Sequence, residues 1–217
     1  MMPTMRLLIA TAVLLAGCAA PGGPRFVLLE SGSYCCGAAE GLGCGLAIAP
    51  VLHRIDELEG VAESSVSWDG RTFRIEVLPG AEPDRVAAEA AALLEGEACC
   101  VTASRGKAAP APPDQWFNEK QTVVLSRHEA GVIASHYAST IAAEVALEHD
   151  VAERLHAVLR EELERAFEQA HAAGGGVYRL REQLPVAWPR FEARLAEFLT
   201  PEQSEQVAAL VARELDE

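Results

Sequence analysis

The chain has 217 residues, half of them hydrophobic, and a formal net charge of -14 at pH 7. This length allows one or two small domains, each with an apolar core. The excess of acidic residues argues against nucleic-acid binding and against electrostatic docking on anionic lipid, because both need a basic face.

Residues 1–17 have the pattern of a secretory signal peptide. Arg6 precedes an apolar run over residues 7–15, which is too short to span a bilayer as a helix. Cys18 follows the sequence Leu-Ala-Gly, and this pattern resembles the lipobox of bacterial lipoproteins. The resemblance implies cleavage before Cys18, diacylation of its thiol, and a periplasm-facing chain held in the membrane of the cell envelope by lipid. The alternative is an ordinary signal peptide with a bystander cysteine. Ala19, in place of aspartate, indicates outer-membrane sorting by the enterobacterial rule.

Short alternating elements follow a tether at residues 18–24. Period-two and helical apolar spacings predict strands at residues 25–31, 66–68, 73–77 and 98–103, and helices at residues 47–59 and 84–94. Asp69-Gly70 predicts a tight turn between the two middle strands. The order βαββαβ predicts a ferredoxin-like domain of the α+β class over residues 25–103.

Cys44 precedes the first predicted helix, whose apolar spacing ends at Gly60-Val61. This arrangement resembles the heavy-metal-associated domain, whose metal loop reads Gly-x-x-Cys-x-x-Cys. Counting back from Gly60 places Cys44 at the first metal cysteine of that loop and Ala47 at the second. Counting forward from the first strand, Gly32 and Cys35 also fit Gly-x-x-Cys. We interpret the loop as enlarged, so that Cys35, Cys36 and Cys44 replace the two family cysteines.

Five cysteines follow the lipidation site, and they are Cys35, Cys36, Cys44, Cys99 and Cys100. In a ferredoxin-like sheet the last strand lies antiparallel beside the first, so we expect these thiols at one end of the domain. One interpretation is a disulfide between the two vicinal pairs, which would staple a small exported domain. The other is a thiolate site for a soft metal ion such as Cu(I), Hg(II) or Zn(II). The two interpretations are compatible, because one disulfide uses two of the five cysteines and leaves three, and an odd number of cysteines cannot all pair internally. Thiol-disulfide exchange ranks below both, since no Cys-x-x-Cys motif is present.

Residues 104–118 are rich in alanine and proline and predict a linker, after which residues 119–217 predict an all-α hairpin or bundle domain. Helices are expected at residues 126–147, 150–173, 177–199 and from Thr200 onward, with the third broken or kinked at Pro185 and Pro189. Thr200 and Gln203 predict a capping box at the start of the last helix.

Leu199-Thr200-x-x-Gln203 resembles the LTxxQ motif of Spy/CpxP-type periplasmic proteins, which include chaperones and sensors of envelope or metal stress. That family usually carries two copies, and residues 147–151 do not supply the first. The histidines of this half are interpreted as solvated or partly packed, with a metal site on one helix face as the less favoured alternative: His128, His136, His149, His156 and His171. The Glu/Arg runs of residues 160–165 are interpreted as solvated faces.

The sequence shows no nucleophile elbow, phosphate-binding glycine loop, HExxH motif or paired-carboxylate signature, so we do not expect an enzyme. The predicted function is a lipid-anchored periplasmic carrier or sensor of a soft metal ion, whose helical half contacts a protein partner. The alternative is an envelope-stress chaperone or interaction protein, in which a disulfide-stapled ferredoxin-like domain binds no metal.

Overall fold

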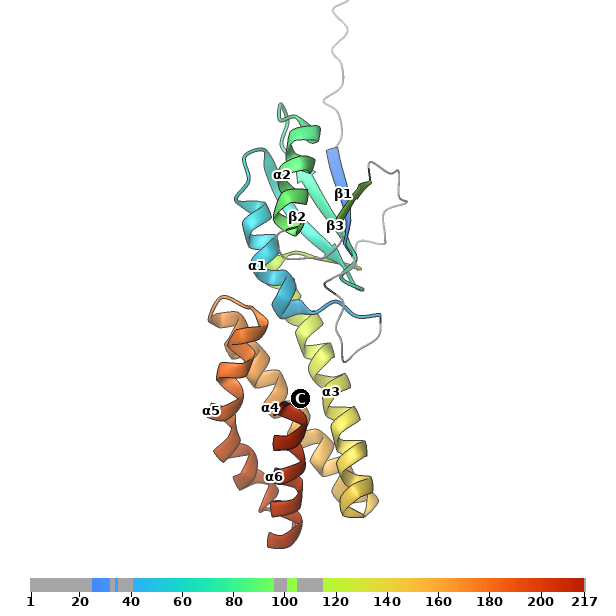
Figure 1. The fold of residues 1–217 in the computed structure, drawn as a ribbon, viewed down its shortest axis with the longest axis vertical. Coiled ribbons are helices and arrows are strands. Elements are labelled where there is room, and N and C mark those ends of the chain that lie inside the picture. Colours follow the sequence, from blue (N-terminus) through green and yellow to red (C-terminus); the bar gives the residue numbers. More distant parts are fainter. Residues whose placement is uncertain (1–24, 32–33, 35–40, 96–100, 105–114, 217) are drawn as a thin grey trace, which may run out of the picture.

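The computed structural model describes residues 25–31, 34, 41–95, 101–104 and 115–216. The fold is α+β: a half that contains an antiparallel sheet precedes a half made of helices (Figure 1). The two halves lie end to end along the long axis of the molecule, and helix α1 (Gly45–Asp56) lies where they meet. None of the described helices is both long enough and apolar enough to cross a bilayer.

The first half has the predicted order βαββαβ, and this prediction is confirmed. The elements are β1 (Arg25–Ser31), α1 (Gly45–Asp56), β2 (Val61–Ser67), β3 (Thr72–Val77), α2 (Pro83–Glu95) and β4 (Val101–Ser104). With a short fifth strand, β5 (Trp116–Phe117), the strands of the sheet lie in the order β4-β1-β3-β2-β5, and every pair is antiparallel. Both helices lie on one face of this sheet (Figure 1).

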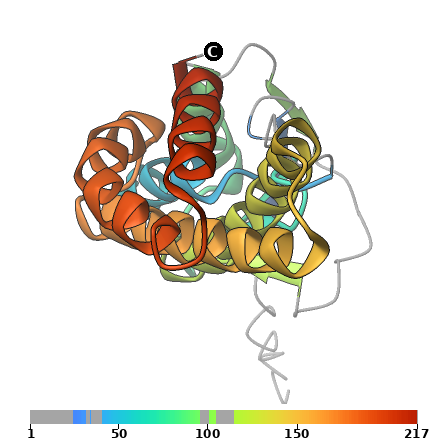
Figure 2. The same ribbon diagram turned by 90° about the horizontal axis from the view of Figure 1, so that it is seen from below.

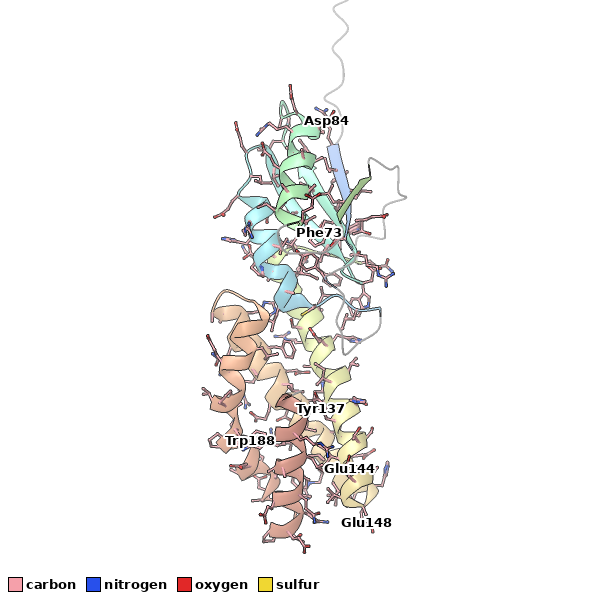
Figure 3. The ribbon with its side chains drawn as sticks, in the orientation of Figure 1. Phe73, Asp84, Tyr137, Glu144, Glu148 and Trp188 are labelled. Carbon is pink, nitrogen blue, oxygen red and sulfur yellow. The ribbon has the colours of Figure 1, made fainter. Side chains whose placement is uncertain are left out.

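The apolar core of this half lies between that face and the two helices. Alternate residues of a strand point to the same face, and Leu29, Phe73 and Ile75 are accordingly fully buried. Leu29 pairs with Phe73 across β1 and β3, and Figure 3 labels Phe73 within this half. Helices α1 and α2 contribute Leu52 and Val86, which are also fully buried.

A fifth strand, β5 (Trp116–Phe117), extends the sheet beyond β2. The sequence predicts these residues to be part of the linker, because two residues are too few to show a strand periodicity. Both side chains are more than nine-tenths buried, and Phe117 pairs with Val66. The chain then turns through the short 3-10 helix η2 (Glu119–Gln121), which begins with a capping box between Asn118 and Gln121.

Four helices form the second half: α3 (Thr122–Val145), α4 (His149–Ala172), α5 (Val177–Leu195) and α6 (Pro201–Asp216). Helix α4 packs between α3 and α5, and α6 packs against both of those neighbours, an arrangement visible end-on in Figure 2. The core of this half includes five buried side chains, namely Ile141, Leu155, Phe167, Leu195 and Val207.

Two features of these helices bear on the sequence predictions. The sequence predicted a break or a kink in helix α5 at Pro185 and Pro189. The helix continues through both prolines, so a break there is wrong. Both prolines are exposed, and water can therefore hydrate the carbonyl that each one leaves without an N–H partner. The capping box is confirmed: the Gln203 amide donates to Thr200 Oγ1 over 3.2 Å, and the Thr200 amide donates to Gln203 Oε1 over 3.1 Å.

Candidate functional site

Cys44 lies at the N-cap position of α1, and its side chain is half-buried. Its extended backbone (φ -77°, ψ 103°) starts the helix, and its carbonyl accepts a hydrogen bond from the Ile48 amide over 3.1 Å. The Cys44 side chain makes no capping hydrogen bond, and the first turn of the helix contains no acidic residue. A helix N-terminus favours negative charge, because its first amide N–H groups have no partner within the helix. The position therefore suits a thiolate.

Backbone hydrogen bonds hold Cys44 close to the end of β1. Its amide donates to the carbonyl of Tyr34 over 2.8 Å, and the neighbouring Gly43 amide donates to the carbonyl of Trp68 over 2.8 Å. The turn that follows β2 packs on the same point, since a β-carbon on Gly70 would lie 2.6 Å from the Tyr34 carbonyl oxygen. Gly70 also has a φ of +72°, a conformation that glycine adopts without a steric cost.

The first residue of β4 lies at this end of the sheet as well. Val101 pairs with Ser31, the last residue of β1. Tyr34 precedes Cys35 in the sequence and lies shortly after the end of β1. Val101 follows Cys100 in the sequence and pairs with the end of β1. The other predicted site residues lie outside the described residues, and they are Cys18, Cys35, Cys36, Cys99 and Cys100.

The described residues alone do not form a metal centre. Among them, no group of three or more His, Cys, Asp and Glu side chains is arranged to hold a metal ion. They contribute one thiol of the predicted set, that of Cys44. The fit of this region to a soft metal ion therefore depends on the cysteines next to Tyr34 and Val101 in the sequence.

Helix α1 also packs directly on the helical half. A β-carbon on Gly45 would lie 2.3 Å from the Thr122 carbonyl oxygen and 2.5 Å from Ser126 Oγ, so only glycine allows this approach between α1 and α3. At the next residue, the carbonyl of Leu46 accepts a hydrogen bond from the Gly176 amide over 2.8 Å. Cys44 contacts the apolar cores of both halves, so the N-terminus of α1 joins them.

His171, near the end of α4, belongs to this junction. Its Nε2 lies 2.9 Å from Ser126 Oγ, the same hydroxyl that Gly45 approaches. Burial lowers the pKa of His171 below its ordinary value, because the charged imidazole loses hydration there. The prediction that the histidines of this half are solvated or partly packed fits His171 as a partly packed residue. The contact between His171 and Ser126 depends on the packing of α4 against α3, which the sequence does not show.

The prediction that the Glu/Arg runs of residues 160–165 are solvated faces is wrong for Glu162. Its side chain is 6 % exposed and binds Arg165, Arg190 and Arg194, two of which come from α5. Hydrogen bonds and charges from Arg190 and Arg165 outweigh the desolvation that burial causes, so the pKa of Glu162 is lowered. The signal in the sequence was its position: Glu162 continues the apolar row of Leu155 and Val158 at helical spacing.

The histidines of α4 do not share one environment. His149 is 90 % exposed and pairs with Glu153, whereas His156 lines a groove against α3.

A scan of protein-family models finds none that matches the chain, and searches of curated proteins and of solved structures find no significant similarity.

Proposed function

We propose that this protein is a lipid-anchored envelope protein that binds a soft metal ion through cysteine thiolates. In this proposal the sheet half is a ferredoxin-like, heavy-metal-associated-like domain, and Cys44 supplies one ligand. Cys35 and Cys36 supply others, with Cys99 or Cys100 completing the set. Thiolates favour Cu(I), Hg(II) and Zn(II), so these ions are the candidates.

One observation carries the proposal: Cys44 begins α1 beside the end of β1. The 2.8 Å hydrogen bond from its amide to the Tyr34 carbonyl brings the helix N-terminus next to the residue that precedes Cys35 in the sequence. The pairing of Ser31 with Val101 brings in the residue that follows Cys100. Cys44 itself, Tyr34 before Cys35 and Val101 after Cys100 therefore all lie near the end of β1.

The junction supports a role for the helical half in reporting the state of the site. Cys44 is the N-cap of helix α1, and Gly45, the first residue of the helix, contacts α3. A change in the position of Cys44 on metal binding would therefore act on Thr122 and Ser126, the residues of α3 that Gly45 touches. We infer that the helical half contacts a protein partner and that metal binding alters this contact.

Native mass spectrometry of the mature chain, with Cys18 replaced by Ser to remove lipidation, tests the metal site. The chain is measured before and after mild reduction, with and without Cu(I), Hg(II) or Zn(II). The proposal expects a stoichiometric adduct of the reduced chain that is lost in the Cys35→Ser/Cys36→Ser/Cys44→Ser variant. His53→Gln is the matched control, since His53 lies on α1 with a 57 % exposed side chain and should keep the adduct.

The same measurement distinguishes the alternative. Two disulfides and no adduct in either redox state would contradict metal binding and favour an envelope interaction or chaperone protein built on a disulfide-stapled domain. The anchor is tested separately, by metabolic labelling with radioactive palmitate and membrane fractionation. Label and membrane association should both disappear in Cys18→Ser. If the full chain carries no label, the lipoprotein proposal is wrong.

A further inference from the structure

Two large apolar side chains are exposed at one corner of the sheet, on the side that carries no helix. Phe26 of β1 is 45 % exposed, and Leu78, directly after β3, is 44 % exposed. Phe26 pairs with Glu76 across these strands, so Leu78 is its diagonal neighbour. Val27 and Val77, the adjacent residues of the two strands, are buried and point to the opposite face, which α1 and α2 cover (Figure 1).

This corner lies at the end of the sheet half that is remote from the helical half. Strand β1 starts at Arg25 and ends at Ser31, close to the hydrogen bond between Tyr34 and Cys44 at the junction. A strand rises about 3.3 Å per residue, so the start of β1 lies about 20 Å from its junction end. Figure 3 labels Asp84, at the start of α2, at the same remote end. The corner is therefore separate from the proposed metal site.

The proposed lipid anchor leads to this end of the molecule. Arg25 follows Cys18 by seven positions in the sequence. Seven residues span at most about 25 Å, whatever path they take, so a lipidated Cys18 keeps the start of β1 within that distance of the bilayer. The exposed pair of Phe26 and Leu78 is therefore held close to the membrane surface. This inference rests on the lipid anchor proposed above.

Charged groups of both signs surround the exposed pair. The guanidinium carbon of Arg74 lies 5.1 Å from the centroid of the Phe26 ring and 4.9 Å from that of Trp116. Among the described residues Arg74 forms no ion pair, so its N–H groups are available to an acceptor such as a lipid phosphate. Glu76 pairs with both Phe26 and Glu63, so the same face also carries carboxylates. Such a surface suits headgroups with both charges better than anionic lipid.

The small size of this corner favours a membrane over a protein as its partner. A stable protein interface buries about 800 Å² on each side, which takes about 20–30 residues. The corner offers one pair of exposed apolar side chains, Phe26 and Leu78. A membrane contact can be smaller, because the lipid anchor already holds the chain at the surface and makes the contact intramolecular.

We propose that this corner, formed by Phe26, Leu78 and Arg74, rests on the zwitterionic lipid surface to which the chain is anchored. Phe26 and Leu78 enter the boundary between headgroups and acyl chains, as apolar side chains of peripheral proteins do. Arg74 donates hydrogen bonds to a lipid phosphate, and a charged donor strengthens them. The contact turns α1 and α2, which cover the opposite face of the sheet, away from the bilayer.

Hydroxyl-radical footprinting, read out by peptide mass spectrometry, tests this contact on the full mature chain. The chain carries Cys18→Ser and an N-terminal hexahistidine tag, which binds phosphatidylcholine vesicles that contain a small fraction of nickel-chelating lipid. The untagged chain with the same vesicles is the reference. Because the tag replaces the native lipid, the result does not depend on lipidation of Cys18. A wrong lipoprotein proposal is revealed by the palmitate experiment, and a wrong contact surface by this one.

The exposed apolar residues of the helical half provide matched internal controls. Tethering should lower the oxidation of Phe26 and Leu78 about threefold, because the tether gives the contact a high effective concentration. Val124 is 44 % exposed and Val186 is 70 % exposed, and both should be oxidised as in the reference. Replacing part of the phosphatidylcholine by phosphatidylglycerol should weaken the protection, since the chain has a net charge of -14.

Two variants separate this surface from general adhesion to lipid. Leu78→Gln should remove about half of the protection of Phe26, because it takes apolar area out of the contact. Val124→Gln changes a residue of equal exposure in the helical half and should leave the protection of Phe26 unchanged. Both substitutions are at exposed positions, and far-UV circular dichroism verifies the fold of each variant.

Three results would overturn the proposal. One is oxidation of Phe26 and Leu78 that tethering leaves unchanged. Another is equal protection of Val186, which would indicate unspecific coverage of the chain by lipid. The last is protection of Phe26 and Leu78 that grows with protein concentration in the absence of vesicles, which would assign this corner to a second copy of the chain.

Discussion

The two halves of the molecule solve the problem of burial in different ways. Among the described residues of the sheet half, the buried polar side chains are uncharged, and they include Ser31, Ser64 and Ser65. In the helical half, two carboxylates are buried as well, Glu129 and Glu162, and Glu162 binds three arginines. The first half therefore depends chiefly on apolar packing, and the second adds charge pairing across helices.

Despite this difference the two halves share helix α1, whose residues pack in the cores of both. Leu46 packs in the core of the helical half, while Ile48, only two residues later, packs in the core of the sheet half. Unfolding of α1 would therefore expose apolar side chains from both cores. We expect the two halves to unfold together.

The largest effect is expected from Phe73→Ala in the sheet core. Phe73 is fully buried and packs its ring edge-to-face on Tyr34, with centroids 5.4 Å apart. Its truncation should lower the free energy of unfolding by about 3–5 kcal/mol. Urea titration followed by circular dichroism should show one transition, because α1 couples the halves. Phe26→Ala, at a 45 % exposed position of the same sheet, should cost far less. Two separate transitions would show that the halves are independent.

The next effect is expected at the junction. In Gly45→Ala the new β-carbon would clash with the Thr122 carbonyl at 2.3 Å, which forces α1 away from α3. We expect a loss of about 1–3 kcal/mol and a broader urea transition as the coupling weakens. Gly131→Ala is the matched control, a helical glycine with open space, and should stabilise the chain by up to about 1 kcal/mol. Equal effects of the two substitutions would contradict the close approach.

Glu162→Gln tests the charge pairing of the helical half. We expect a loss of about 1–2 kcal/mol at neutral pH, less than for a fully buried pair because Arg165 and Arg190 are each 42 % exposed. The folded-state pKa of Glu162 is lowered, so its stabilising contribution is present above the ordinary value of 4.5 and is lost as the pH falls through the lower folded value. Urea midpoints of the wild type and variant should therefore converge in acid, and a constant difference would contradict this assignment.

His171→Gln is expected to have the smallest effect. Glutamine can keep a hydrogen bond to Ser126 but cannot titrate, so the change at neutral pH should stay below about 1 kcal/mol. The folded pKa of His171 is lowered, so the wild type should lose stability as the pH falls from the ordinary value of 6.5 toward the folded value. The variant should lack this loss. Thermal melting temperatures measured across that range check the prediction, and parallel curves would contradict it.

The sequence predicted the regular elements of the sheet half well, because a half-buried strand and an amphipathic helix each impose a period on their apolar residues. Leu29, Phe73 and Ile75 follow such a period, and Gly70 stands where the predicted turn needs a positive φ. The capping box at Thr200 also follows from local chemistry, since both of its hydrogen bonds lie within four residues.

The features that escaped prediction are those for which the partner is distant in the sequence. Trp116 and Phe117 form a strand only because β2 offers a free edge beside them. Glu162 is buried only because α5 brings Arg190 and Arg194 over it. The unbroken course of α5 through two prolines depends on which side of that helix faces water.

By itself the sequence determined the order βαββαβ, the cap at Thr200 and the cysteines that define the metal hypothesis, because these depend on local spacing and residue chemistry. Only the tertiary structure decided that Cys44 starts a helix shared by two cores, and that His156 faces a groove while His149 faces solvent. Those outcomes depend on how helices approach one another. A single glycine at position 45 permits that approach here, which no local pattern reveals.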